Sequence, residues 1–165
     1  MVILLRFRTA THADLRVIIT WIPDANACRR WAGPAVKFPL TPASLSQDII
    51  FSPDNSYCLE EKGHRVGFGQ LIPKSEQRLH AARIIVAPPE RGRGFGRKLC
   101  QSLIDRAAEL KYPCLSLNVY KDNPTAIQLY QSLGFEALER PEKDSLPHDI
   151  CYMEKRLSSP SNSRR

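Results

Sequence analysis

Apolar and polar residues along the chain follow two periods in turn, one typical of strands and one typical of helices. Alternating positions predict strands at about 2–8, 56–61, 65–73, 77–86, 114–120, 135–140 and 149–157. Helical spacing and capping residues predict helices at about 12–21, 24–31, 95–111 and 123–133, and a turn or helix at 41–51. Strand–helix–strand units mixed with hairpins predict an α/β fold, in which helices flank one mixed sheet.

The segment 86–97, with the sequence VAPPERGRGFGR, joins a predicted strand to a predicted helix. Its glycines and basic residues are Gly92, Gly94, Gly96, Arg91, Arg93, Arg97 and Lys98. Glycine lets the chain turn tightly and brings backbone N–H groups close to a ligand. A helix start adds unpaired donors and a partial positive charge, so the segment is suited to an anionic diphosphate.

The spacing of the glycines separates this loop from two familiar phosphate loops. A P-loop needs Gly-Lys-Ser/Thr, whereas Gly96 is followed by Arg97-Lys98-Leu99. A dinucleotide fingerprint needs Gly-x-Gly-x-x-Gly, whereas the spacing here is Gly-x-Gly-x-Gly. The alternative without a ligand is a basic glycine-rich loop that only begins a helix.

A second motif follows at residues 123–135. Asn123 is a good helix N-cap, and Pro124 is favoured at the first helical position. Gly134 suits the left-handed position that ends a helix, and Phe135 suits the hydrophobic contact that accompanies it. The sequence therefore defines both ends of a short helix.

Together the two motifs resemble those of the GNAT N-acetyltransferase superfamily, and in particular its small bacterial single-domain members. The first is the coenzyme A loop Arg-x-x-Gly-x-Gly, from Arg91 to Gly96. The second is Asn-x-x-Ala-x-x-x-Tyr-x-x-x-Gly-Phe, matched at Asn123, Ala126, Tyr130, Gly134 and Phe135. The resemblance implies a central sheet of about seven strands, two of them splayed apart to admit acetyl-CoA.

The resemblance also implies which residues contact the coenzyme. These are Ile85, Val86, Arg91, Gly92, Arg93, Gly94, Gly96, Arg97, Asn118, Asn123 and Tyr130. Backbone groups near Val86 bond the pantetheine arm, which acts as a substitute strand. Asn118 is expected to be a buried amide that needs partners. Asn123 is either a coenzyme contact or only a helix cap.

The reaction implied is acetyl transfer from the thioester to a primary amine by direct attack in a ternary complex. A lysine-type ammonium, with a pKa of about 10.4, needs help with deprotonation. His80 is the first candidate base, because histidine titrates near neutral pH and residues 80, 82, 84 and 86 share one side of a regular strand. Glu60, Glu61 and water remain alternatives, as does a purely structural His80.

Tyr130 is the candidate general acid for the departing thiolate, a role that the resemblance implies. The alternative is a tyrosine that only packs its helix against the core. Trp21 and Trp31 lie in the segment that, in this family, helps to wall the acceptor pocket. Two tryptophans there are either packing anchors or substrate contacts.

Length and composition predict a single domain at residues 2–157 and a flexible polar tail at 158–165. No apolar run is long enough to span a membrane, and the first residues are predicted to be a strand rather than a secretory signal. The five cysteines are scattered without a Cys-x-x-Cys pair, which favours a reducing cytoplasm and predicts neither disulfides nor a metal site.

The net charge of +7 admits partners other than an anionic coenzyme. The basic residues form no long block outside the glycine loop, which disfavours nucleic acid. Two alternative functions remain: a non-catalytic acyl-CoA-binding regulatory module, and a basic RNA- or ribosome-associated protein. An exposed sheet edge is compatible with a homodimer.

Overall fold

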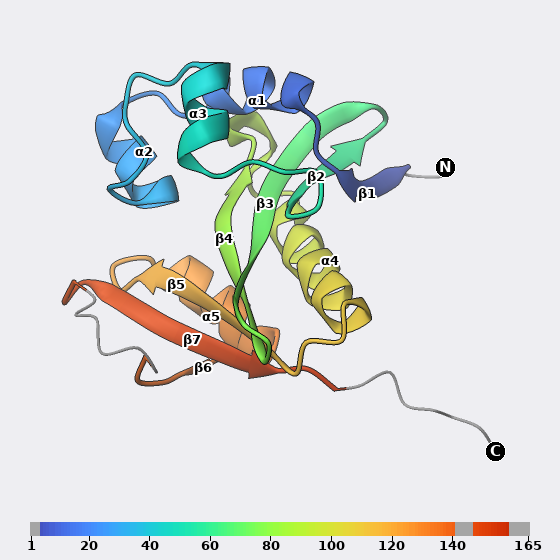
Figure 1. Ribbon diagram of the computed structural model, residues 1–165, viewed down its shortest axis with the longest axis vertical. Helices are drawn as coiled ribbons and strands as arrows, with labels where there is room; N and C mark the ends of the chain where they lie inside the picture. The colour runs from blue at the N-terminus through green and yellow to red at the C-terminus, as the bar shows by residue number, and fades with distance from the viewer. Residues whose placement is uncertain (1–3, 141–146, 159–165) are drawn as a thin grey trace. The chain divides into compact units, whose positions relative to one another are not determined.

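The computed structural model of the protein describes residues 4–140 and 147–158. Its seven strands form one sheet in the order β1-β2-β3-β4-β5-β7-β6 (Figure 1). The strands are β1 (Leu5–Thr9), β2 (Ser56–Glu61), β3 (His64–Ser75), β4 (Arg78–Val86), β5 (Cys114–Tyr120), β6 (Glu136–Ala137) and β7 (Ile150–Arg156). The pair β4–β5 is parallel, while β1–β2, β2–β3, β5–β7 and β6–β7 are antiparallel. The predicted mixed sheet is therefore confirmed.

Five α-helices accompany the sheet within the described residues. They are α1 (His12–Ile18), α2 (Ala25–Ala32), α3 (Pro42–Asp48), α4 (Phe95–Glu109) and α5 (Pro124–Ser132). Two short 3₁₀ turns are η1 (Ile19–Trp21) and η2 (Pro88–Glu90). The four predicted helices are present, and the segment predicted as a turn or helix at 41–51 contains α3; most of the helices are shorter than expected.

The largest differences from the sequence prediction lie at element ends. The helix predicted at 12–21 is α-helical only to Ile18 and then tightens into η1. The helix predicted at 95–111 ends at Glu109, because Lys111 takes a φ of 65°, outside the helical range. The strand predicted at 135–140 is reduced to β6, an edge strand whose two residues are both exposed.

The β2–β3 hairpin follows the turn chemistry of its sequence. Lys62 and Gly63 join the strands, with φ of 50° and 79°. Positive φ at both central residues is the requirement of a type I′ turn, which matches the twist of the flanking strands. The hairpin expected at this position is confirmed.

The chain divides into two compact units. The first lies within residues 1–70 and 82–102, and the second within residues 71–81 and 103–165. Strands β3 and β4 and helix α4 each contribute residues to both units.

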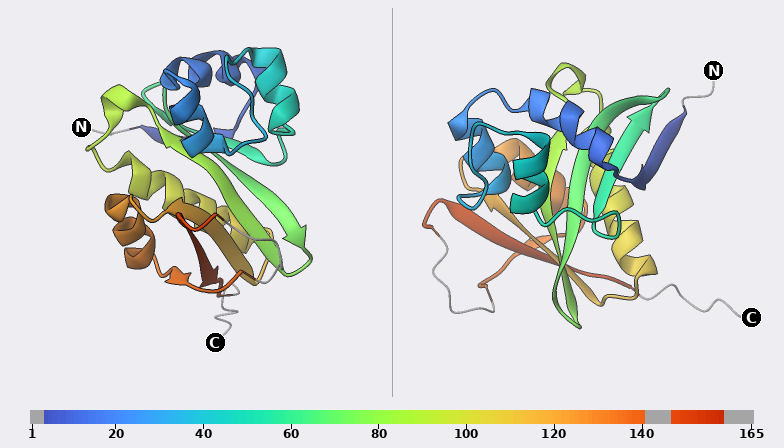
Figure 2. Two further views of the ribbon diagram at one scale, coloured as in Figure 1. Left: turned by 90° about the vertical axis from the view of Figure 1, so that its left-hand side faces the viewer. Right: turned by 45° about the horizontal axis from the view of Figure 1, so that its top comes forward.

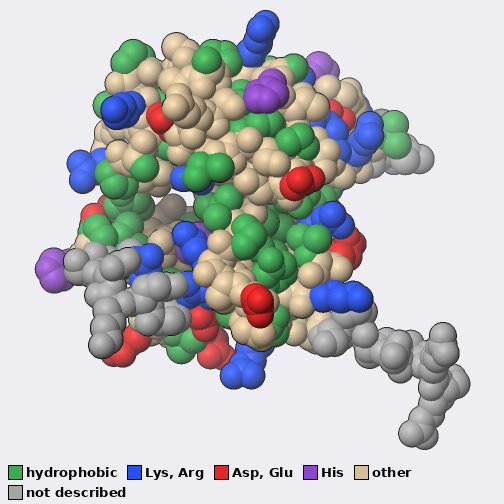
Figure 3. Space-filling view, in the orientation of Figure 1, with side chains coloured by type: hydrophobic (Ala, Val, Ile, Leu, Met, Phe, Trp, Pro, Cys, Tyr) green, Lys and Arg blue, Asp and Glu red, His purple; other side chains and the backbone are tan. Residues whose placement is uncertain are grey.

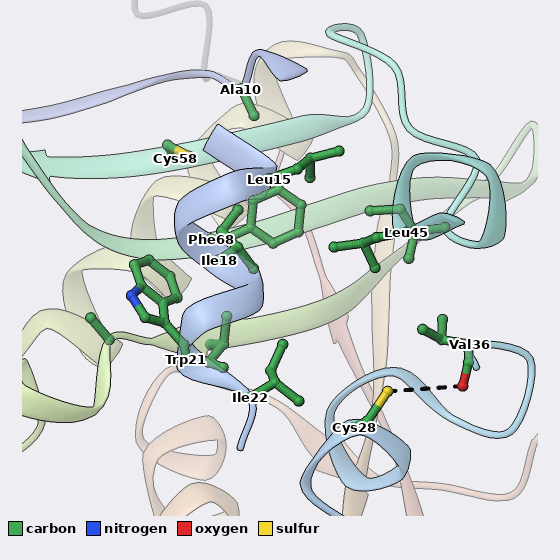
Figure 4. Close-up of a cluster of buried hydrophobic side chains, with 13 residues drawn as sticks. Ala10, Leu15, Ile18, Trp21, Ile22, Cys28, Val36, Leu45, Cys58 and Phe68 are labelled. Atoms are coloured by element: carbon green, nitrogen blue, oxygen red, sulfur yellow. Dashed lines mark hydrogen bonds between the residues drawn. The ribbon is translucent and has the colours of Figure 1, made fainter. Parts of the chain in front are cut away.

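The core of the first unit is apolar and lies between the strands and helices α1 to α3 (Figure 4). Leu15 and Ile18 of α1 and Phe68 of β3 are fully buried in it. The neighbouring Gly67 serves the opposite face of β3, where a Cβ would lie 3.1 Å from Leu99 of α4. Burial of each large side chain contributes about 1.5–3 kcal/mol, so this packing fixes the strands that carry the glycine loop.

A buried carboxylate fixes the start of α1 in the same unit. Asp14 is fully buried and receives hydrogen bonds from Arg8 at 2.7 and 2.8 Å, and it also pairs with Arg65. It accepts the Thr11 N–H at 2.7 Å as well. Burial alone would raise the pKa of Asp14, but these donors outweigh it and hold that pKa well below its usual range.

In the second unit, β7 pairs with β5 along the whole length of both strands, from Cys114 opposite Arg156 to Tyr120 opposite Ile150. Figure 2 shows the two strands running side by side. Leu115, Leu117 and Met153 are buried along this pair. The long pairing gives the residues of β5 a firm support.

None of the described helices has the length and apolar character that crossing a bilayer requires. On the face drawn in Figure 3, the Lys and Arg side chains of the described residues lie scattered and form no continuous band. The predicted tail at 158–165 falls, after residue 158, outside the described residues.

Candidate functional site

The glycine turn before α4 is open. Gly92 and Gly94 have φ of 80° and 85°, values that residues other than glycine rarely adopt. A Cβ at either position would meet nothing within 4 Å, and both residues are exposed. The Gly94 carbonyl accepts the Lys98 N–H at 3.3 Å, so Gly94 stands at the N-cap of α4. Glycine has no side chain with which to satisfy the N–H groups of the first turn.

The four cations of this turn differ in their surroundings. Arg91, Arg97 and Lys98 are exposed. Arg93 instead donates to Glu61 with two nitrogens, each at 3.1 Å, and pairs with Glu90. Its guanidinium also lies 4.8 Å from the centre of the Phe95 ring. Arg93 therefore ties the turn to β2, and carboxylates offset its charge.

The two glutamates named as alternative bases are both engaged in ion pairs. Glu60 accepts a hydrogen bond from Arg8 Nε at 2.6 Å. Glu61 holds Arg93. Both carboxylates are thus engaged by guanidinium groups of the protein.

His80 lies where the pairing of β4 with β5 ends. The registered pairs are Arg78–Cys114, Leu79–Leu115 and His80–Ser116. Beyond Ser116, β5 continues to Tyr120 with β7 as its registered partner. The registered pairs of the described residues give the other edge of this part of β5 no strand partner, and an unpaired edge of this kind is what a strand-like ligand requires.

Ser116 is the hydrogen-bond partner of His80 Nδ1. The Ser116 hydroxyl is fully buried, lies 2.8 Å from His80 Nδ1 and donates to the Leu79 carbonyl at 3.4 Å. When the hydroxyl hydrogen points to the Leu79 carbonyl, Ser116 Oγ accepts from the Nδ1–H of His80. The ring lone pair then lies on Nε2, the nitrogen that can take a proton.

Tyr152 lies on β7, the strand of the second unit that pairs with β5. Tyr152 accepts from Arg78 and donates to Glu154 Oε1 at 2.6 Å. Burial and the bond to Glu154 raise the pKa of Tyr152 to about 12, so its hydroxyl keeps its proton at neutral pH.

The regular alternation expected along β4 is interrupted after His80. Arg83 has a φ of 52°, a left-handed conformation within a strand. The expectation that residues 80, 82, 84 and 86 share one side assumed an unbroken pleat, and this assumption is wrong. Arg83 was not among the residues singled out from the sequence. A charged residue directly before Ile84-Ile85-Val86 was the signal that could have identified it.

Tyr130 is held at the end of α5 by the chemistry that ends the helix. The Phe135 N–H donates to the Tyr130 carbonyl and the Gly134 N–H to the Gln131 carbonyl, both at 3.0 Å. These two bonds, with Gly134 at a φ of 97°, form a Schellman motif. Its hydrophobic contact is the Tyr130–Phe135 ring pair, with centroids 5.9 Å apart. The predicted helix end is confirmed, and the ring of Tyr130 is part of it.

The two candidate asparagines behave differently from one another. Asn123 Oδ1 accepts the Ala126 N–H at 3.2 Å, so the helix-cap interpretation is confirmed for its oxygen. Asn118 is exposed, so the expectation that it is a buried amide is wrong. Exposure removes the argument from burial and leaves Asn118 open to contact with a ligand.

Trp31 packs within the first unit and also makes one polar contact. Its ring centroid lies 6.3 Å from that of Phe68, and its Nε1–H donates to the Arg83 carbonyl at 2.9 Å. Trp21 is buried in the core. All five cysteines are free, and the described residues contain no cluster of potential metal ligands.

Comparisons with known proteins agree with the motifs and the fold. The acetyltransferase (GNAT) family pattern matches residues 21–135, so the chain belongs to this family. The peptidyl-lysine N-acetyltransferase YiaC of Escherichia coli is 30% identical over 135 residues, which cover 80% of this chain and 84% of that protein.

Two further proteins define how far the likeness extends. The L-2,4-diaminobutyric acid acetyltransferase of Nocardia farcinica is 35% identical, but the match covers 50% of this chain and only 44% of that protein. The crystal structure of Vibrio cholerae spermidine N-acetyltransferase in complex with CoA and spermine has a TM-score of 0.73 and 24% identity, covering 94% of this chain and 96% of that chain. This structural likeness supports the fold.

Proposed function

We propose that the protein is an acetyl-CoA-dependent N-acetyltransferase, which moves an acetyl group from the thioester to a primary amine by direct attack in a ternary complex. The observation that carries the proposal is the open glycine turn at the start of α4. Gly92 and Gly94 take left-handed conformations with open space where a side chain would lie. A diphosphate needs such close access to backbone N–H groups.

The first unit supplies the groups for the diphosphate. Backbone donors between Arg91 and Arg97 face the anion, and the exposed side chains of Arg91, Arg97 and Lys98 add charge. Arg93 contributes mainly by holding the turn, because Glu61 and Glu90 already bind its guanidinium. Ile85 and Val86 serve the pantetheine arm through their backbone groups.

The second unit supplies the groups for the reaction. His80 Nε2 takes a proton from the acceptor ammonium, while Ser116 lies against the opposite ring nitrogen. The neutral amine then attacks the thioester carbonyl, and the proton that its nitrogen still has to lose passes to the departing thiolate. The nitrogen–carbon bond forms as the carbon–sulfur bond breaks. Tyr130 donates a hydrogen bond to the departing sulfur and stabilises its developing charge. Asn118 and the backbone edge of β5 serve the amides of the coenzyme arm.

The relatives indicate the reacting group of the acceptor rather than the whole acceptor molecule. Their names include a peptidyl-lysine, a diaminobutyric acid and a spermidine acetyltransferase. All three acceptors present a primary amine. We assign the same reacting group to the acceptor of this chain, on either a small molecule or a peptide.

Thermal unfolding with and without acetyl-CoA tests the proposal, with release of the coenzyme thiol in the presence of amines as a second readout. A ligand at a hundredfold excess over its Kd should add about 2.7 kcal/mol to the free energy of unfolding. Desulfo-CoA, which keeps the diphosphate, should stabilise the protein comparably but release no thiol. An unchanged unfolding curve with acetyl-CoA would refute the proposal.

A further inference from the structure

Ser116 is a buried polar residue next to the proposed base. It lies on β5, is fully buried and is the registered partner of His80 on β4. Side chains of registered partners point to the same side of a sheet, and Ser116 Oγ lies 2.8 Å from His80 Nδ1. Both residues belong to the second unit, so their contact lies within one compact part of the chain.

The Ser116 hydroxyl contacts two groups that differ in what they can do. One is His80 Nδ1, and the other is the Leu79 carbonyl, at 3.4 Å. A carbonyl oxygen can only accept, whereas Nδ1 donates when it carries a hydrogen and accepts when it does not. The position of the hydrogen on the imidazole ring therefore decides how many of these bonds form.

A hydrogen on Nδ1 allows both bonds at once. The ring then donates to Ser116 Oγ, and the hydroxyl donates onward to the Leu79 carbonyl. If the hydrogen is on Nε2 instead, the hydroxyl gives its hydrogen to Nδ1 and loses the bond to Leu79. Because Ser116 is fully buried, bulk water cannot replace that bond. One additional hydrogen bond favours the Nδ1–H tautomer about fivefold.

The arrangement with two bonds also persists when the ring takes a proton. An imidazolium carries hydrogens on both nitrogens, so Nδ1 continues to donate to Ser116 and the hydroxyl keeps its direction. With the hydrogen on Nε2, the hydroxyl would have to rotate each time the ring becomes charged. Polar groups that need no reorganisation during the reaction are those that favour catalysis.

The charged groups beside this pair are balanced. Arg78 and Glu154 lie 3.9 Å apart, and Tyr152 donates to Glu154 at 2.6 Å. Burial raises the pKa of the Cys114 thiol and raises that of Tyr152 to about 12, so both groups are uncharged at neutral pH. Histidine ordinarily titrates near neutral pH, so His80 is the one of these five residues that suits proton transfer.

We propose that Ser116 is a positioning residue for acetyl transfer. Its hydroxyl keeps the hydrogen of neutral His80 on Nδ1, and this makes Nε2 the nitrogen that takes the proton of the acceptor ammonium. The inference rests on the proposed acetyl transfer with His80 as its base. Ser116 acts on the reaction only through His80.

NMR of the ring nitrogens of histidine tests the inference on the whole protein without turnover. At a pH of about 8.5, well above the ordinary pKa of histidine, His80 should carry its hydrogen on Nδ1 about five times as often as on Nε2. Ser116→Ala should remove this preference. His80→Gln identifies the signal among the four histidines of the chain. A wild-type ring with its hydrogen mainly on Nε2 would overturn the inference, as would an unchanged preference in Ser116→Ala.

Ser56→Ala is the matched control for the loss of a buried hydroxyl. Ser56 is also fully buried in a strand, and its hydroxyl donates to Asn55 Oδ1 at 2.7 Å. Both substitutions should lower thermal stability, but Ser56→Ala should leave the tautomer of His80 unchanged. If Ser56→Ala altered the tautomer as much as Ser116→Ala does, the effect would come from general packing, and the inference would fail.

Kinetics in two backgrounds connect the contact to turnover. Ser116→Ala should lower kcat about tenfold, because the ring loses its tautomer and its fixed orientation, and should change the KM for acetyl-CoA less than about twofold. In the His80→Gln background, the same substitution should change kcat less than about twofold, because no base remains to be positioned. Equal losses in both backgrounds would overturn the inference.

Failure of the proposed function would be seen differently. A wild-type protein that neither binds acetyl-CoA nor releases its thiol would refute acetyl transfer, whatever the tautomer of His80. A His80→Gln variant as active as wild type would overturn the role of Ser116 together with that of His80, and would leave acetyl transfer to another base.

Discussion

Helix α4 begins differently from the other described helices. At α2, α3 and α5 a side chain of Asp24, Thr41 or Asn123 accepts a backbone N–H of the first turn. At α1 the carboxylate of Asp14, a residue of the first turn, accepts the backbone N–H of Thr11. At α4 the corresponding position is Gly94, which has no side chain. The four closed starts stabilise the protein itself, whereas the open start leaves its donors for a partner.

The contrast also separates the roles of the two family motifs. The glycine turn of α4 is open and exposed, so its proposed function depends on backbone donors. Helix α5 is closed by Asn123 at one end and by Gly134 at the other. What α5 has to offer a reaction is therefore a positioned side chain, Tyr130.

The largest effect on activity is expected at Tyr130 of α5. Tyr130→Phe keeps the ring contact with Phe135 but removes the hydroxyl, so kcat should fall about 1000-fold while acetyl-CoA affinity changes little. Steady-state kinetics with a saturating acceptor measure the change. Turnover within twofold of wild type would exclude the acid role and leave Tyr130 as a packing residue.

A substitution at the capped start of α1 should lower the free energy of unfolding of the protein. Asp14→Asn removes the charge that holds Arg8 and Arg65, and should cost about 3 kcal/mol at pH 7 in urea unfolding. Because the fold lowers the pKa of Asp14, its contribution is present above pH ~4 and is lost as pH falls further. The gap between wild type and variant should therefore shrink below pH ~4. A gap independent of pH would contradict the assigned charge.

A substitution at the uncapped start of α4 should lower the affinity of the protein for acetyl-CoA. Gly94→Asp adds a cap, a negative charge and strain at a φ of 85°, so acetyl-CoA affinity should fall about 100-fold. Gly33→Asp is the matched control, since Gly33 also has a positive φ of 80° and open space around it. If both variants bind acetyl-CoA equally well, the turn is not the diphosphate site.

The smallest effect is expected at the cap of α5. Asn123→Ala should lower the free energy of unfolding by about 1 kcal/mol, because it leaves the Ala126 N–H without its acceptor. Acetyl-CoA affinity should change less than threefold, while Asn123→Asp should restore most of the stability. A large loss of affinity with unchanged stability would instead assign Asn123 to the coenzyme.

The sequence predicted those features that depend on neighbouring residues. The limits of β2 and β5, the I′ turn at Lys62 and both ends of α5 follow from local alternation, capping and turn chemistry. The ends of α1 at Ile18 and of α4 at Glu109 were not predicted. The first is followed by the 3₁₀ turn η1, and the second by Lys111 in a left-handed conformation. Pattern and propensity leave such limits uncertain by a few residues.

The candidate site was predicted only where motifs carry it. The glycine turn and Tyr130 were identified, while the partners of the named residues were not. The contact of Ser116 with His80 and that of Glu61 with Arg93 depend on pairings between distant segments. Such pairings follow from strand register, which no local pattern in a single sequence specifies.

The Schellman motif around Tyr130 has a thermal consequence. The proposed acid lies in the last turn of a helix of 9 residues, and helix ends open at lower free-energy cost than the core. Two backbone bonds and one ring contact oppose that fraying. Once warming breaks these contacts, Tyr130 should be displaced while the sheet is still folded, and we expect turnover to decline below the melting temperature of the protein.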